Sequence, residues 1–80
     1  MLAGVSVDHR DPAPLHEQLA GILRAAIKAG EYRDMLPSES QLQAEHGVSR
    51  GTVRRAIATL ESEGLVRTIQ ARGTFVVKRR

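Results

Sequence analysis

Residues 38–64 read SESQLQAEHGVSRGTVRRAIATLESEG, and this stretch decides the fold. Ser38 is followed three residues later by Gln41, the pairing that caps the start of a helix reciprocally, which predicts a helix over about residues 39–46. Gly47 can then make a sharp turn, and the hydroxyl of Ser49 can cap a further helix over about residues 50–63. Two short helices joined so tightly indicate a helix-turn-helix.

The second of these helices has one apolar side. Val53, Ala56, Ile57 and Leu60 recur at helical spacing and share one sector when the sequence is projected at 100° per residue. We therefore expect this stripe to be buried. The remaining residues of the first turns are expected to face outward, and these are Arg50, Gly51, Thr52, Arg54 and Arg55.

The charges on the same helix oppose its dipole. Arg50, Arg54 and Arg55 occupy the N-terminal half, whereas Glu61 and Glu63 occupy the C-terminal end. Each such placement costs about 0.3–1 kcal/mol where unscreened, so helix stability does not explain it. An external polyanion explains the arginines, because a recognition helix presents its N-terminal residues to base edges in the major groove. A solvated face with arginines by chance is the alternative.

The residues before this stretch predict one more helix. Apolar residues recur at helical spacing over about residues 14–29, and Gly30 supplies the stop because it can adopt positive φ. Residues 31–37 cross over to the next helix, and Pro37 keeps Leu36 out of helical geometry. Residues 1–13 lack a sustained period and are expected to form a partly ordered arm.

The residues after it predict a β-hairpin over about residues 65–77. Residues 65–70 and 74–77 are rich in β-branched and aromatic residues, and a polar turn at 71–73 separates them. Val66 and Ile69 are three positions apart, so their side chains would face opposite sides of one strand. The sequence therefore leaves the register of the hairpin open. The fold class is α+β, mainly α: a winged helix-turn-helix with three helices and a C-terminal wing, with a short first strand near 35–37 left open. Residues 78–80 are expected to be a basic tail or linker start.

Composition limits the classes of protein that this chain can be. Its 80 residues allow one small core, and 12 Lys and Arg against 9 Asp and Glu give a net charge of +3. The sequence pI of about 10.2 is in the range of nucleic-acid-binding domains. No signal-type segment or long apolar run is present. We expect a soluble, cytoplasmic protein without a membrane partner.

Enzymatic and metal chemistry find little support in the residue pattern. The absence of cysteine removes disulfides, thiolate metal sites and a cysteine nucleophile. His9, His16 and His46 form no metal-type pair, and the glycines form no phosphate-cradling loop. We therefore expect a non-enzyme with no catalytic residues, no cofactor and no metal.

Several motifs together resemble the GntR family of bacterial regulators. They are Leu36-Pro37-Ser38-Glu39, Gly47-Val48-Ser49-Arg50, Thr52-Val53-Arg54, Glu63-Gly64-Leu65-Val66 and Gly73-Thr74-Phe75-Val76, with Pro14-Leu15 and Gln18 before the first helix. Their order and spacing match too, so the resemblance covers about residues 12–77. The consecutive Arg54 and Arg55 resemble the pair of arginines that is frequent in the subgroup that includes the histidine utilisation repressor.

This resemblance implies a DNA-binding domain that reads a double-stranded, pseudo-palindromic operator as part of a transcription regulator, typically a repressor. It also implies homodimerisation, in the full-length protein or on DNA, and an effector that binds only a C-terminal domain beyond residue 80. Arg50, Thr52 and Arg54 match the family's base and phosphate contacts, and Arg72 and Gly73 fall at the wing tip. The complete set of expected DNA-binding residues is Ser38, Ser49, Arg50, Gly51, Thr52, Arg54, Arg55, Gln70, Arg72 and Gly73.

The sequence departs from the family pattern at a few positions. Ser40 stands where many members have an arginine that touches phosphate, and Ala71 replaces a common wing glycine. The crossover before Leu36 is about two residues shorter than usual. A winged-helix module that binds another protein is the alternative function, because a fold alone does not determine function.

Overall fold

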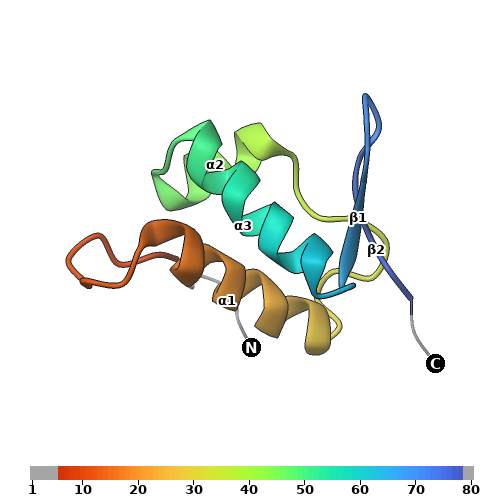
Figure 1. Cartoon of the computed structure of the whole chain (residues 1–80), viewed down its shortest axis with the longest axis horizontal. Coiled ribbons are helices and arrows are strands. Elements are labelled where there is room, and N and C mark those ends of the chain that lie inside the picture. Colours follow the sequence, from red (N-terminus) through yellow and green to blue (C-terminus); the bar gives the residue numbers. More distant parts are fainter. Residues whose placement is uncertain (1–5, 79–80) are drawn as a thin grey trace.

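The structure is a computed structural model that describes residues 6–78. Three helices are followed by two antiparallel strands, which confirms the expected winged helix-turn-helix fold class (Figure 1). The helices are α1 (Leu15–Lys28), α2 (Glu39–His46) and α3 (Arg50–Ser62), and the strands are β1 (Val66–Ile69) and β2 (Gly73–Val76). Residues 1–5 of the expected arm and 79–80 of the expected tail lie outside the described residues.

The boundaries of α1 come from its flanking residues. The carbonyl of Pro14 accepts hydrogen bonds from the N–H groups of Glu17 and Gln18, at 3.0 and 3.1 Å, and so opens the helix. Gly30 ends the helix with φ at 81°, as expected from its freedom at positive φ. Its N–H donates to the carbonyl of Ile27 at 3.1 Å, which satisfies one of the last helical acceptors.

The helix-turn-helix is built from two side-chain caps and one glycine. Ser38 and Gln41 form the expected capping box at the start of α2. Gly47 ends α2 in the left-handed conformation, with φ at 63°. Ser49 caps α3 by accepting from the N–H of Thr52 at 3.1 Å. These local interactions set the tight turn between α2 and α3.

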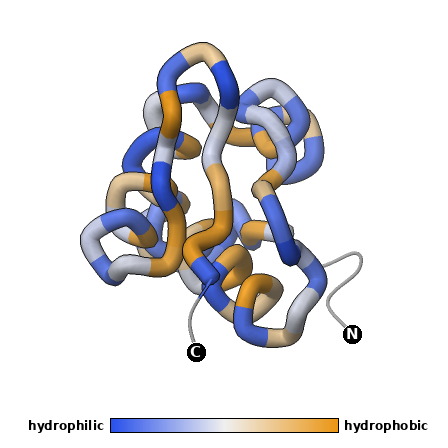
Figure 2. Tube along the Cα trace, turned by 90° about the vertical axis from the view of Figure 1, so that its right-hand side faces the viewer, coloured by the Kyte–Doolittle hydropathy of each residue, from blue (hydrophilic) through white to orange (hydrophobic). Residues whose placement is uncertain are grey.

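The core lies between α1, α2, α3 and the base of the hairpin. Figure 1 shows α3 lying between α1 and α2, and in Figure 2 the hydrophobic stretches gather where the hairpin base meets the helices. Leucine, isoleucine, valine and alanine supply the buried cluster, as the scarcity of aromatic residues requires. Its members are Val7, Leu19, Ala20, Leu23, Leu36, Leu42, Val53, Ala56, Ile57, Leu60 and Val66.

The register of the hairpin resolves the ambiguity left by its sequence. Val66 pairs with Val76, and Ile69 pairs with Gly73. Val66 enters the core, whereas Ile69 stays 40% exposed, because residues of opposite parity face opposite sides of a strand. The turn therefore comprises residues 70–72, one residue earlier than the polar segment 71–73 suggested, and Gly73 belongs to β2.

The segment before α2 pairs with the free edge of β2. The N–H of Leu36 donates to the carbonyl of Thr74 at 2.9 Å, and the N–H of Val76 donates to the carbonyl of Asp34 at 2.8 Å. An isolated bridge joins Met35 to Phe75. The short first strand that the sequence left open is therefore a single bridge, in keeping with the shortened crossover.

The segment 6–13 packs against the helix-turn-helix. Val7 is only 7% exposed and belongs to the core. Its N–H donates to Nδ1 of the buried His46 at 3.3 Å, and Nε2 of His9 donates to the carbonyl of His46 at 3.0 Å. The N–H of Asp8 donates to Oε1 of Gln18 at 2.8 Å. These contacts give the described part of the arm a place in the domain.

The wing turn holds one residue in an unfavourable conformation, and we predict that glycine there stabilises the domain. Ala71 has φ at 66° in the turn closed by the bond from the N–H of Arg72 to the carbonyl of Ile69. An L-residue pays about 1–2 kcal/mol in this region, and the freedom of glycine in the unfolded chain offsets about 0.4–1 kcal/mol. Ala71→Gly should therefore raise the free energy of unfolding by up to about 1 kcal/mol in urea titrations.

The matched control for this prediction is Ala58→Gly, at an exposed position inside α3. The same chemical change should there lower the free energy of unfolding by about 1 kcal/mol, because glycine disfavours a helix interior. Destabilisation by both substitutions would contradict the strain that we assign to Ala71.

The buried imidazole of His46 predicts a pH dependence of stability. Burial holds its pKa below the ordinary value of 6.5, against the opposing charge of Glu45. The folded chain therefore binds fewer protons here than the unfolded chain, and this contribution to stability is full above pH 6.5 and is lost as the pH falls through the lowered pKa. Urea titrations should show a less stable domain at about pH 5.5 than at about pH 7.5.

His46→Gln is the control, because an amide oxygen can still accept from the N–H of Val7 but does not titrate. We expect this variant to lose most of the difference between the two pH values. An unchanged difference would assign the effect to another group.

Candidate nucleic-acid interface

The outward surface of α3 carries the arginines. Val53, Ala56, Ile57 and Leu60 are buried, as the apolar stripe predicted. This rotation of the helix leaves Arg50, Gly51, Arg54 and Arg55 exposed, and Thr52 half-buried beside its cap. All five expected residues of α3 are therefore accessible to solvent, Thr52 only in part.

The acidic end of α3 has an internal explanation, which corrects the argument from the dipole. The guanidinium of Arg24 in α1 donates to both carboxylate oxygens of Glu63, at 2.8 and 2.6 Å. This bond holds the pKa of Glu63 below its ordinary value. Oε2 of Glu61 accepts from the N–H of Thr68 at 3.1 Å. These carboxylates secure α3 to α1 and β1, so they require no external partner.

The basic end of α3 is neutralised only in part. Nε of Arg54 donates to Oε2 of Glu39 in α2 at 3.2 Å. Within residues 6–78, the structure records no ion pair for Arg50 or Arg55. The dipole argument for an external anion therefore rests on these two residues and on the free end of Arg54.

Gly51 has no structural reason to be glycine. Its φ is not positive, and a Cβ there would meet only Oγ of Ser49, at an ordinary contact distance of 3.8 Å. Alanine also favours a helix more strongly than glycine does. The missing side chain instead leaves a flat spot on the exposed surface of the first turn of α3.

Ser38 and Ser49 act as helix caps, as expected. Each hydroxyl accepts a backbone N–H at 3.1 Å, from Gln41 and Thr52 respectively. The hydroxyl of Ser49 also donates to Oγ1 of Thr52 at 3.1 Å. Both serines remain exposed at the N-terminal ends of α2 and α3, where the helix dipole favours an anion.

The expected wing residues gather at the end of the hairpin. Gln70 and Arg72 are exposed in the turn, and Gly73 opens β2. Gly73 has φ at 129°, and a Cβ there would lie 2.9 Å from Cε of Met35. The backbone conformation therefore requires glycine at this position, whereas the flexible end of the Met35 side chain could move aside.

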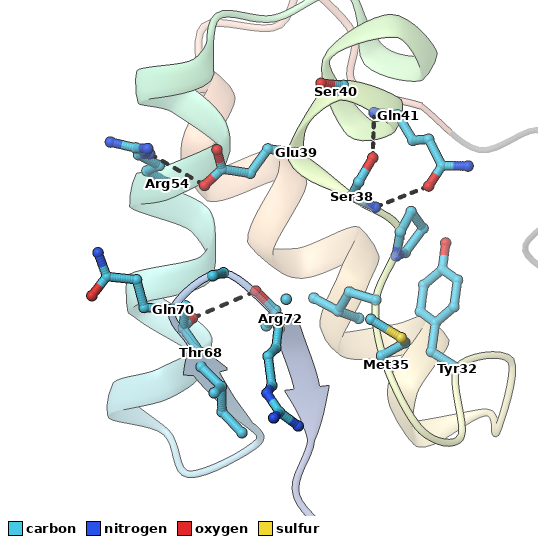
Figure 3. A pocket seen from close by; sticks show the side chains of 16 residues that line it. Tyr32, Met35, Ser38, Glu39, Ser40, Gln41, Arg54, Thr68, Gln70 and Arg72 are labelled. Carbon is cyan, nitrogen blue, oxygen red and sulfur yellow. Dashed lines mark hydrogen bonds and ion pairs between the residues drawn. The ribbon is translucent and has the colours of Figure 1, made fainter.

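An open groove of about 800 Å³ separates the start of α2 from the wing (Figure 3). Arg54, Glu39 and Ser38 lie along one wall, and Gln70 and Arg72 belong to the other. Of the expected DNA-binding residues, this groove brings together Ser38, Arg54, Gln70, Arg72 and Gly73, whereas Ser49, Arg50, Gly51, Thr52 and Arg55 do not line it. It also includes residues that sequence reasoning did not select, among them Tyr32, Glu39, Gln41 and Thr68.

The only sequence signals for these additional residues were local. Glu39 and Gln41 belong to the motif read as a helix start, and Tyr32 is the only tyrosine in the chain. Burial and the charges of Glu45 and Glu31 raise the pKa of Tyr32. None of these local features indicates that the side chains face the wing.

The described residues offer neither a metal-type cluster nor a membrane-spanning helix. Within 6–78 no group of three or more His, Cys, Asp or Glu side chains is arranged to hold a metal ion. None of the helices in that range combines the length and apolar character needed to cross a bilayer.

Comparison with known families gives a match to most of the chain. Residues 15–76 match the model of the bacterial regulatory proteins, gntR family. An uncharacterised HTH-type transcriptional regulator of Rhizobium meliloti is 44% identical over 75 residues, which cover 91% of this chain and 31% of that protein. A histidine utilization repressor of Klebsiella aerogenes is 41% identical over 69 residues, which cover 84% of this chain and 29% of that protein. The chain thus spans about a third of the length of these relatives.

A solved structure shares the fold. The crystal structure of the AraR DNA-binding domain in complex with operator ORX1 superposes with a TM-score of 0.83 at 31% sequence identity. The superposition covers 91% of this chain and 95% of that one. The resemblance inferred from the motifs, to histidine utilisation repressors among others, is confirmed by these comparisons.

Proposed function

This chain belongs to the GntR family of bacterial regulatory proteins, and on that premise we propose that it reads double-stranded operator DNA for a transcription regulator. The observation that carries the proposal is the outward basic half of α3. Arg50 and Arg55 are exposed, and the described chain records no ion pair for either. A duplex supplies both the phosphates and the purine edges that such a surface binds.

In the proposed complex, α3 enters the major groove with its N-terminal half leading. Arginine can grip guanine O6 and N7 with two N–H groups, which suits Arg50, Arg54 and Arg55. The methyl group of Thr52 can meet the methyl group of thymine, and the flat spot at Gly51 admits a close approach of the base edges. The contacts of α3 thus supply the discrimination between sequences.

The other elements orient α3 on the duplex. The exposed hydroxyls and N-terminal N–H groups at Ser38 and Ser49 are proposed to contact phosphates in addition to their capping role. The wing is proposed to follow the neighbouring minor groove, where Arg72 is attracted by the negative potential of a narrow groove and Gln70 can reach base edges. Gly73 has no side chain, so the backbone next to the wing turn can approach the DNA closely.

The assembly is proposed from the family. Two copies would bind a pseudo-palindromic site, either on DNA or through the rest of a full-length protein, and would act as a repressor in the cytoplasm. A small-molecule effector would bind outside these 80 residues. The proposed role is non-catalytic and needs no cofactor. The relatives give no support to the alternative of a protein-binding module.

Selection from random DNA duplexes tests the proposed function. We expect the chain to recover a short motif, arranged as a pseudo-palindrome when two copies bind. Affinity for that motif should fall steeply with salt, by about 0.9 in log–log slope for each phosphate contacted. If the chain instead retains every duplex equally and modest salt abolishes this binding, the surface is merely basic and does not read sequence.

Gly51→Ala separates the needs of the fold from the needs of DNA binding. We expect this variant to be more stable by up to about 1 kcal/mol, because alanine favours the helix and nothing obstructs its Cβ. Its affinity for the selected duplex should nevertheless fall about tenfold, since the new methyl group occupies the space between protein and base edges. Urea titration and fluorescence anisotropy give the two values.

The matched control is Gly21→Ala in α1. A Cβ at Gly21 would lie 4.0 Å from the guanidinium of Arg24, so this site is also open. Gly21→Ala should raise stability and leave DNA affinity unchanged. Equal affinity for Gly51→Ala and the original chain would remove Gly51 from the contact surface.

A further inference from the structure

An acidic side chain stands on the surface that carries the arginines. Glu39 is the first residue of α2, and its carboxylate borders the groove between α2 and the wing. Its side chain is 39% exposed, and its Oε2 accepts the Nε–H of Arg54 at 3.2 Å. A carboxylate close to phosphates opposes DNA binding through charge repulsion. If Glu39 lies beside DNA, a favourable contact of its carboxylate must offset the repulsion from the phosphates.

The ion pair engages Arg54 through one nitrogen only. Nε is bonded to Glu39, and the two terminal nitrogens remain for a partner outside the chain. The Arg54 side chain is 64% exposed, and in Figure 3 the dashed contact joins it to Glu39 while the end of its guanidinium points away from Glu39. Because the guanidinium is planar, a bond at Nε restricts the plane in which the terminal N–H groups point.

We infer that Glu39 is a positioning residue for base reading: it presets the guanidinium plane of Arg54, so that the two terminal nitrogens meet one base pair in a defined orientation. This inference rests on the proposed DNA-reading function. A long side chain that is already oriented loses less rotamer freedom on binding. It is also less free to turn to a nearby phosphate, which carries no sequence information.

The other arginines of α3 provide an internal comparison. Within residues 6–78 neither Arg50 nor Arg55 has an ion pair. The effect of Glu39 should therefore be confined to the base pair that Arg54 contacts. Glu39 also lies in the first turn of α2, where a negative charge stabilises the helix dipole. Stabilisation of the helix dipole alone would not make discrimination between DNA sequences depend on Glu39.

The test compares Glu39→Ala with Glu39→Gln. Both variants remove the negative charge, but only glutamine keeps an oxygen that can accept the Nε–H of Arg54. The duplex selected by the original chain and its single-base-pair substitutions are titrated with each protein at one salt concentration. Arg54→Ala, measured in the same way, identifies the base pair that Arg54 reads. Thermal unfolding verifies that every variant is folded.

We expect Glu39→Ala to lose about tenfold in discrimination at the base pair identified by Arg54→Ala, and to keep its discrimination elsewhere. Glu39→Gln should retain part of it. Equal discrimination by both variants and the original chain would overturn the inference, as would a loss at a different base pair, which would make Glu39 itself a base contact. If the original chain selects no motif, the proposed function itself fails.

Discussion

The packing of α3 against α1 is the contact on which the rest of the structure depends. Leu19 and Leu23 of α1 and Val53 and Leu60 of α3 are almost completely buried in one cluster, and the ion pair of Arg24 with Glu63 joins the two helices as well. A helix that buries one stripe cannot rotate about its axis without exposing it. The direction in which the arginines of α3 point is therefore determined by apolar side chains on the opposite side of the helix.

The surface around those arginines combines three separately constrained parts. Capping by Ser38 and Ser49 sets where α2 and α3 begin, and Gly47 sets the turn between them. The wing is held by the bonds between β2 and residues 34 and 36, so the start of α2 and the hairpin share one backbone connection. Arg54 and Glu39 meet because all three parts are in place.

The sequence predicted most of what is local and missed most of what joins distant residues. Helix periodicity, the capping box at Ser38 and the glycine stop at Gly30 depend on neighbours within four residues, and they were correct. The pair of Arg24 with Glu63 joins residues 39 positions apart, so its geometry depends on how two helices cross. Without that contact, the acidic end of α3 was read as an unexplained charge. The placement of Glu39 beside Arg54 was missed for the same reason, and none of these observations tests the DNA contacts themselves.

The segment ahead of α1 has a practical consequence for protein engineering. The family match starts at residue 15, but the buried cluster already includes Val7. A fragment trimmed to the matched range would lose the burial of a valine, which contributes about 1.5–3 kcal/mol, and would leave Nδ1 of His46 without its donor. The minimal autonomous unit for expression and crystallisation is thus longer than the range that matches the family.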